Sequence, residues 1–166
     1  MTLRHFNGDL ADRALELVKP AVEAFLKSPL AEGAEGVCVC ITGDEDDQKA
    51  MSGLYAYHYY ASDPTAFYDR SAGRAHLSAA TDAAKMARRE QAPTRKVRIE
   101  TPARLRRDDP DPPVAGVYEP GVAIGVAGLS EAFNIMIGWM TLNAVFALMD
   151  HAEALRAASK TATEAR

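Results

Sequence analysis

Cysteine is almost absent from this chain of 166 residues, which contains only Cys38 and Cys40. Residues two apart on a strand point to the same side but are held apart by the extended backbone, so a disulfide between them would be strained. A structural zinc site normally needs four ligands, and the chain has no second cysteine pair. The sequence therefore excludes a disulfide-stapled fold and predicts two free thiols that act as small buried hydrophobic side chains.

The sequence also lacks a recognisable leader and an obvious membrane span. Residues 1–9 contain no apolar core of the kind that a signal peptide needs. The apolar run Ile135–Met149 is shorter than the roughly 20 residues of a spanning helix and contains Asn143. These absences predict a cytoplasmic protein with no membrane partner.

The chain has no excess of positive charge. It contains 19 Lys and Arg against 23 Asp and Glu, for a net charge of −4, which argues against non-specific binding to nucleic acid. The apolar content of 48% and charged content of 25% are those of an ordinary globular protein. We therefore expect a single domain over residues 1–166 and no nucleic-acid partner.

Hydrophobic spacing and turn residues predict three helical regions and five strands. Helices are expected after the capping residue Asp9 up to Leu26, from Asp63 to Pro93 with a break at Gly73, and from Ser130 to Ala158 before a frayed tail over residues 160–166. Strands are expected at residues 37–42, 54–61, 97–101, 114–118 and 122–127, the last two joined as a hairpin by Glu119-Pro120-Gly121. The acidic run Asp44–Asp47 predicts a solvated turn, with a surface metal site as the alternative.

Because strands follow one another in runs instead of alternating with helices, the predicted sheet is mostly antiparallel. The expected fold is therefore a mixed α/β (α+β) domain. It has a five-stranded, mostly antiparallel sheet flanked by helices, in a profilin-like or PAS/GAF-like arrangement.

Two short motifs carry a family resemblance. Ala123-Ile124-Gly125-Val126-Ala127-Gly128 precedes the last helix, and Ala83-Ala84-Lys85-Met86-Ala87 lies in the middle helical region. With Gly43-Asp44 at the first hairpin turn, this layout resembles the haem-binding and glycolate-operon accessory proteins, the GlcG/HbpS-like family. The resemblance implies oligomers, and haem or a related small molecule as the ligand.

Aromatic residues gather on the strand at residues 54–61, where Tyr57 and Tyr59 share one face and His58 and Tyr60 the other. An imidazole in such a setting can bind a haem iron axially, whereas a half-buried histidine bonded to a tyrosine or to the backbone is the simpler interpretation. The candidate cofactor-binding residues are Tyr57, His58, Tyr59, Arg70 and His76, with His76 as a potential partner of His58. If the protein is an enzyme, the first residues to test are Tyr57, His58, Tyr59, Asp69 and Arg70.

The four histidines show no metal-ligand spacing, and no catalytic serine motif or dinucleotide-binding glycine loop is present. The glycines at positions 121, 125 and 128 instead suggest close packing of a strand on a helix. No nucleophile–base pair is visible, so whether the protein is an enzyme stays open.

Basic residues are concentrated between positions 85 and 107. Nine Lys or Arg side chains stand there against two Glu, a local excess of +7 that leaves −11 for the rest of the chain. Such a segment can steer an anionic ligand or meet the acidic surface of a neighbouring subunit.

The last predicted helix is apolar on nearly every side, which requires burial in a core or against another chain. We therefore expect a homodimer or a higher even-numbered oligomer with Trp139 in its interface. The leading functional hypothesis is a non-enzymatic small-ligand-binding or sensing domain for haem or another anionic molecule. The alternatives are an oligomeric accessory or structural protein without its own ligand, and an enzyme acting on a small molecule in a tyrosine-lined pocket.

Overall fold

The computed structural model describes residues 6–31, 33–43 and 54–164. The elements are α1 (Gly8–Leu26), β1 (Gly36–Gly43), β2 (Leu54–Ala61), α2 (Pro64–Asp69), α3 (Ser71–Glu90), α4 (Thr94–Glu100), β3 (Ala115–Glu119), β4 (Val122–Ala127) and α5 (Glu131–Glu164), with short 3₁₀ turns at Pro29–Ala31 and Pro102–Arg104. The predicted acidic turn Asp44–Asp47 lies outside the described residues.

The described strands form one open sheet in the order β2-β1-β4-β3, and each neighbouring pair is antiparallel. The mixed α+β class, the antiparallel pairing of the first two strands and the hairpin between β3 and β4 are therefore confirmed. β2 and β3 are the two edge strands, so β2 keeps one long side without a neighbouring strand.

The predicted strand at Val97–Thr101 is wrong, and the described sheet has four strands in place of the expected five. Residues 94–100 form the helix α4, in which Thr94 and Val97 are buried while Ile99 is 68% exposed. Thr94 and Val97 are three residues apart and therefore share one helical face. The alternation of Val97, Arg98 and Ile99 is typical of a strand, but the protein buries Thr94 and Val97, which are spaced as on a helix.

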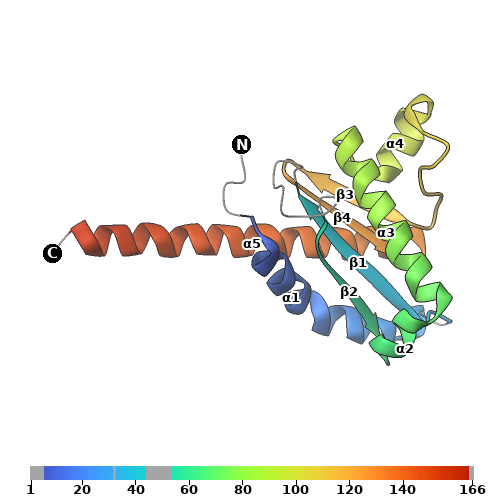
Figure 1. The fold of residues 1–166 in the computed structure, drawn as a ribbon, viewed down its shortest axis with the longest axis horizontal. Helices are drawn as coiled ribbons and strands as arrows, with labels where there is room; N and C mark the ends of the chain where they lie inside the picture. Colours follow the sequence, from blue (N-terminus) through green and yellow to red (C-terminus); the bar gives the residue numbers. More distant parts are fainter. Residues whose placement is uncertain (1–5, 32, 44–53, 165–166) are drawn as a thin grey trace.

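Two layers of helices cover the two faces of the sheet (Figure 1). α1 and α5 pack on one face, where their apolar side chains join Val39, Tyr60 and Ile124 in the larger core cluster. α3 packs on the other face, where Ala80, Ala84 and Ala87 meet Cys38, Cys40 and Ala127. The alternation predicted for β2 is confirmed, because Tyr60 belongs to the first cluster and Tyr59 to the second.

α3 lies very close to the sheet because glycines face it. A Cβ atom added at Gly125 would overlap the carbonyl oxygen of Ala80, and one added at Gly116 would overlap the carbonyl oxygen of Ala83. The predicted role of the strand glycines in close packing is therefore confirmed at Gly125.

The helix ends differ in detail from the predictions. α1 begins after Asn7, whose side chain accepts a hydrogen bond from the backbone N–H of Leu10 (3.0 Å), so Asp9 is not the cap. The middle helical region breaks at Arg70 rather than at Gly73. A Cβ atom on Gly73 would overlap the carbonyl oxygen of Phe67, so this glycine lets the first turn of α3 pack against α2.

α5 is 34 residues long and runs well beyond the sheet (Figure 1). Its first half, which includes the apolar run predicted over residues 132–149, contributes Ile137, Leu142 and Val145 to the core, whereas residues 153–161 are exposed. The helix continues through Glu164, so the frayed tail predicted from residue 160 is wrong up to that point. The helical segment over residues 131–161 is long and apolar enough to cross a membrane, but the core helix of a soluble protein can have the same length and composition.

The Gly125→Ala variant should be destabilised by about 1–3 kcal/mol or more, because its Cβ atom would force α3 away from β4. Chemical denaturation followed by circular dichroism measures the change. Gly33→Ala is the matched control, since a Cβ atom there meets nothing within 4 Å and only the positive φ of +82° opposes it. A Gly125→Ala protein as stable as the wild type would contradict the close approach.

Candidate functional site

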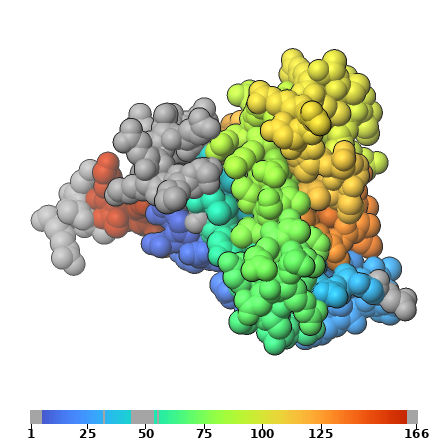
Figure 2. Space-filling view, turned by 45° about the vertical axis from the view of Figure 1, so that its right-hand side comes forward, coloured from blue at the N-terminus to red at the C-terminus, as the bar shows by residue number. Residues whose placement is uncertain are grey.

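An open depression lies between the edge strand β2 and the short helix α2. It has a volume of about 320 Å³ and is lined by Tyr57, His58, Tyr59, Pro64, Thr65 and Tyr68. Figure 2 shows this part of the surface, with β2 in turquoise beside α2 and α3 in green. The depression lies at the sheet edge because both sheet faces are already covered by helices.

Tyr59 is the centre of the depression. Its ring centroid lies 5.8 Å from that of Tyr57 and 5.4 Å from that of Tyr68, with interplanar angles of 83° and 64°. Tyr57 and Tyr68 are 45% and 42% exposed, whereas Tyr59 is only 7% exposed. Two exposed rings therefore stand edge-on to a buried one.

The hydroxyl of Tyr59 is buried and has no hydrogen-bond partner among the described residues. Burial, with smaller contributions from Cys38, Tyr57 and Tyr68, raises the pKa of this phenol above its ordinary value of 10.0, so the group is neutral at physiological pH. An unpaired buried polar group costs free energy that a bound ligand can recover. The site thus contains an unused hydrogen-bonding group at its base.

The local sequence explains how these rings come together. The pleat of β2 places Tyr57 and Tyr59 on the α3 face of the sheet. Asp63 then caps α2 by accepting a hydrogen bond from the backbone N–H of Ala66 (2.9 Å). Within α2, Phe67 turns inward and lies 5.7 Å from the ring of Tyr59, while the neighbouring Tyr68 stays exposed beside it.

His58 lies at the rim, on the other face of β2. Its ring is 4.5 Å from that of Tyr60, whose hydroxyl donates a hydrogen bond to the carbonyl oxygen of Leu15 (2.8 Å). Burial lowers the pKa of His58 below 6.5, against the opposing effect of the carboxylates Glu16, Glu23 and Asp12. The imidazole is therefore neutral at physiological pH and stands in a mainly acidic surrounding.

The structure separates the other predicted site residues from the depression. His76 packs against Phe67 (ring centroids 5.5 Å apart) on the α3 side of the sheet, so it does not meet His58. Its Nδ1 atom is buried without a partner in the described part of the chain, and burial lowers its pKa. Arg70 forms an ion pair with Glu35 (3.0 Å), and Asp69 is exposed at the end of α2.

Three lining residues, Pro64, Thr65 and Tyr68, were not predicted as site residues. The sequence feature that could have pointed to Tyr68 is its position next to Phe67, just after the helix start at Asp63-Pro64. Neighbouring residues of a helix point in directions that differ by about a quarter turn. One of two such aromatic residues can then be buried while the other stays exposed.

The two cysteines are buried and free, as predicted. Burial raises the pKa of Cys40 to about 12 and raises that of Cys38 as well, so neither thiol ionises at physiological pH. Since the thiolate is the reactive form, these side chains are structural.

Haem does not fit this site well. His58 has the neutral imidazole that iron requires. None of the six residues around the depression, however, is a cation that could pair with propionates, and Arg70 is already paired with Glu35. A volume of about 320 Å³ is also at the low end for small-molecule sites. Among the described residues, no group of three or more His, Cys, Asp or Glu side chains is placed to hold a metal ion.

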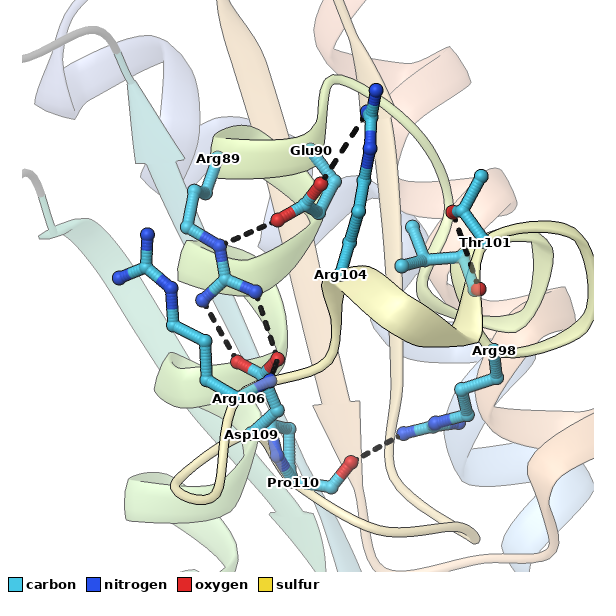
Figure 3. A network of polar contacts seen from close by, with 9 residues as sticks. Arg89, Glu90, Arg98, Thr101, Arg104, Arg106, Asp109 and Pro110 are labelled. Carbon is cyan, nitrogen blue, oxygen red and sulfur yellow. Dashed lines mark hydrogen bonds and ion pairs between the residues drawn. The ribbon is translucent and has the colours of Figure 1, made fainter.

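The basic segment 85–107 is tied into the protein (Figure 3). Arg89 donates two hydrogen bonds to the carboxylate of Asp109, both 2.8 Å long, and one to Glu90 at 2.7 Å. Arg104 lies 3.7 Å from Glu90, and the backbone N–H of Arg106 donates to Asp109. These contacts hold the loop after α4 against the end of α3.

The guanidinium of Arg98 holds the other end of the loop after α4. Arg98 pairs with Glu131 at the start of α5 (2.9 Å) and donates to the carbonyl oxygens of Pro110 and Val114. Arg89, Arg98 and Arg104 are thus engaged within the chain, which reduces the charge available to an anionic ligand.

No family model, curated protein or solved structure that was compared matches this chain. The resemblance to the haem-binding and glycolate-operon accessory proteins therefore rests on motif residues whose roles here are structural. Gly125 allows the backbone of α3 to pack closely against β4. Gly128, with φ of +129°, lies close to the carbonyl oxygen of Gly36. Both roles concern packing and say nothing of a ligand.

Replacing Asp109 with asparagine should lower the free energy of unfolding at pH 7 by about 1–3 kcal/mol, because the bidentate bonds to Arg89 lose their charge. Arg89 holds the pKa of Asp109 below 3.8, so the stabilisation is present above that value and is lost as the pH falls through the lowered pKa. Urea unfolding at several pH values measures this. Asp108→Asn, at the neighbouring exposed residue, is the control; equal effects of the two variants would contradict the network.

Proposed function

We propose that the protein is a non-enzymatic small-ligand-binding or sensing domain whose ligand occupies the depression between β2 and α2. The observation that carries this proposal is the unpaired, buried hydroxyl of Tyr59 below two exposed tyrosine rings. Exposed aromatic side chains gathered around a polar group are typical of binding sites rather than of ordinary surface.

The layered fold supports this role. In a profilin-like or PAS/GAF-like arrangement, a sheet with helices on its faces provides the frame. Here both faces are filled, because Tyr60 is 1% exposed on one side and Cys40 is fully buried on the other. The sheet edge at β2 is then the place where a ligand can reach the aromatic side chains.

The chemistry of the depression favours binding over catalysis. The six lining residues include no carboxylate and no cysteine, and Asp69 and Arg70 lie outside the lining. His58 and Tyr59 are on opposite faces of the strand, so they form no nucleophile–base pair of the kind that covalent catalysis requires. The enzyme alternative therefore has the weakest support.

Screening small aromatic and ammonium-containing fragments by protein NMR tests the proposal. We expect hits that shift the resonances of Tyr57 and Tyr59, and Tyr68→Ala should weaken them at least about tenfold, the scale of about 1–2 kcal/mol for one aromatic contact. Tyr118→Ala, on the opposite edge strand β3, is the matched control.

Haemin belongs in the same screen. A Soret shift that is seen with the wild type and lost in His58→Ala would identify the ligand as haem instead of another small molecule. An absence of hits, or hits that Tyr68→Ala leaves unchanged, would overturn the assignment of the site.

We further propose that α5 pairs with a second copy of the chain, in a homodimer or higher even-numbered oligomer. On one side of α5, Leu155 (58% exposed) follows the half-buried Ala152 and Leu148 at helical spacing, and Leu148 packs against the larger core cluster. A helical segment of about 15 residues is marginally stable in water when nothing covers it. Met136, which is 44% exposed, and the half-buried Trp139 are further apolar side chains of α5, turned away from the Leu155 side by about 100° and about 160°.

Light scattering should give at least twice the chain mass of 17.9 kDa. The Leu155→Glu and Trp139→Glu variants should be monomeric or aggregated, because each places a charge in the paired surface. Leu155 is 58% exposed and belongs to neither core cluster, so its variant separates loss of pairing from unfolding. Ile99→Glu, at a residue of α4 that is 68% exposed, is the control. A wild-type protein that is monomeric at micromolar concentration would contradict the pairing.

A further inference from the structure

We propose that the depression between β2 and α2 binds a small organic cation, such as a quaternary or tertiary ammonium group. This inference rests on the proposed ligand-binding role and names the class of ligand. It departs from the anionic ligand suggested by the basic segment of the sequence.

The arrangement of the tyrosines provides the first argument. Tyr57 and Tyr68 flank Tyr59 at 5.8 and 5.4 Å between ring centroids, with interplanar angles of 83° and 64°. Centroid distances of 5.4 and 5.8 Å at these angles are direct edge contacts, so Tyr57 and Tyr68 form one cluster of rings with the buried Tyr59. The exposed surfaces of Tyr57 and Tyr68 are free to contact a ligand, and the negative face of an aromatic ring attracts a cation held within about 6 Å. Flat stacking on a single plane would instead suit a neutral aromatic ligand.

The charges around the depression provide the second argument. The side chains that act electrostatically on His58 are the carboxylates Glu16, Glu23 and Asp12 and one cation, Lys19, which lies 3.8 Å from Glu16. The field at the His58 rim of the depression is therefore negative and favours a positively charged ligand there.

The polar groups in the lining agree with this charge. The neutral hydroxyl of Tyr59 and the neutral imidazole of His58 can each accept a hydrogen bond from a ligand that carries an N–H or O–H group. An anion would find no guanidinium or ammonium group among the six lining residues. The half-buried basic side chains Arg89 and Arg98 are bound to Asp109 and Glu131.

Isothermal titration of the full chain with choline and with 3,3-dimethylbutan-1-ol tests the inference. The two molecules have the same shape, but only choline carries a positive charge. We expect choline to bind at least about fivefold more tightly, which is the size of an exposed cation–π contribution. Tyr57→Phe should keep most of this preference because the ring remains, whereas Tyr57→Ala and Tyr68→Ala should abolish it and Tyr118→Ala should not.

The outcomes distinguish this inference from the proposed function. Equal binding of choline and its neutral analogue would overturn the cation specificity and leave a ligand site intact. Binding of other fragments at Tyr57 and Tyr59 without choline would do the same. Failure of choline and of every fragment at these tyrosines would overturn both proposals.

Discussion

α3 lies so close to the sheet that a side chain at Gly116 or Gly125 would overlap its backbone. The short side chains of Ala80 and Ala84 complete this contact and leave no room for a ligand on that face. The close contact between α3 and the sheet fixes the direction of α3. The first turn of α3 packs on α2 through Gly73. Because α2 is held in this way beside the outer edge of β2, the position of Tyr68 depends on a packing contact made farther along the helix.

The candidate site lies at the sheet edge because the core fills both faces of the sheet. One sheet face is filled by α1 and α5, and the other by α3, so the most exposed aromatic side chains of the described residues lie at the edge of β2 and on α2. Tyr57 and Tyr68 are the exposed members of this group, and the buried hydroxyl of Tyr59 has no partner within the described residues. The basic segment, which dominates the charge pattern of the sequence, instead fastens the loop after α4 to α3 and α5.

The elements that could be predicted from the sequence are those whose own residues decide their structure. β2 alternates between two buried faces, and the β3–β4 hairpin has a glycine with positive φ at its turn, so both were predicted correctly. α4 was missed because Val97-Arg98-Ile99 alternates as a strand does, whereas the tertiary packing buries Thr94 and Val97, and the hydroxyl of Thr94 accepts a hydrogen bond from the backbone N–H of Gly116. Of the predicted site residues, Tyr57, His58 and Tyr59 line the depression, and their common strand is visible in the sequence. Arg70 and His76 lie outside this lining and contact Glu35 and Phe67, which the sequence does not show because these contacts depend on tertiary packing.

The central claim is that three tyrosines from β2 and α2 form one binding site for a small cation. The most direct measurement is a set of nuclear Overhauser effects between the methyl protons of choline and the aromatic protons of the full-length protein. The account predicts cross-peaks to the rings of Tyr57, Tyr59 and Tyr68, and none to Tyr118 on the opposite edge strand. Cross-peaks that reach only other aromatic residues, or saturating choline with no cross-peak to these three rings, would contradict it.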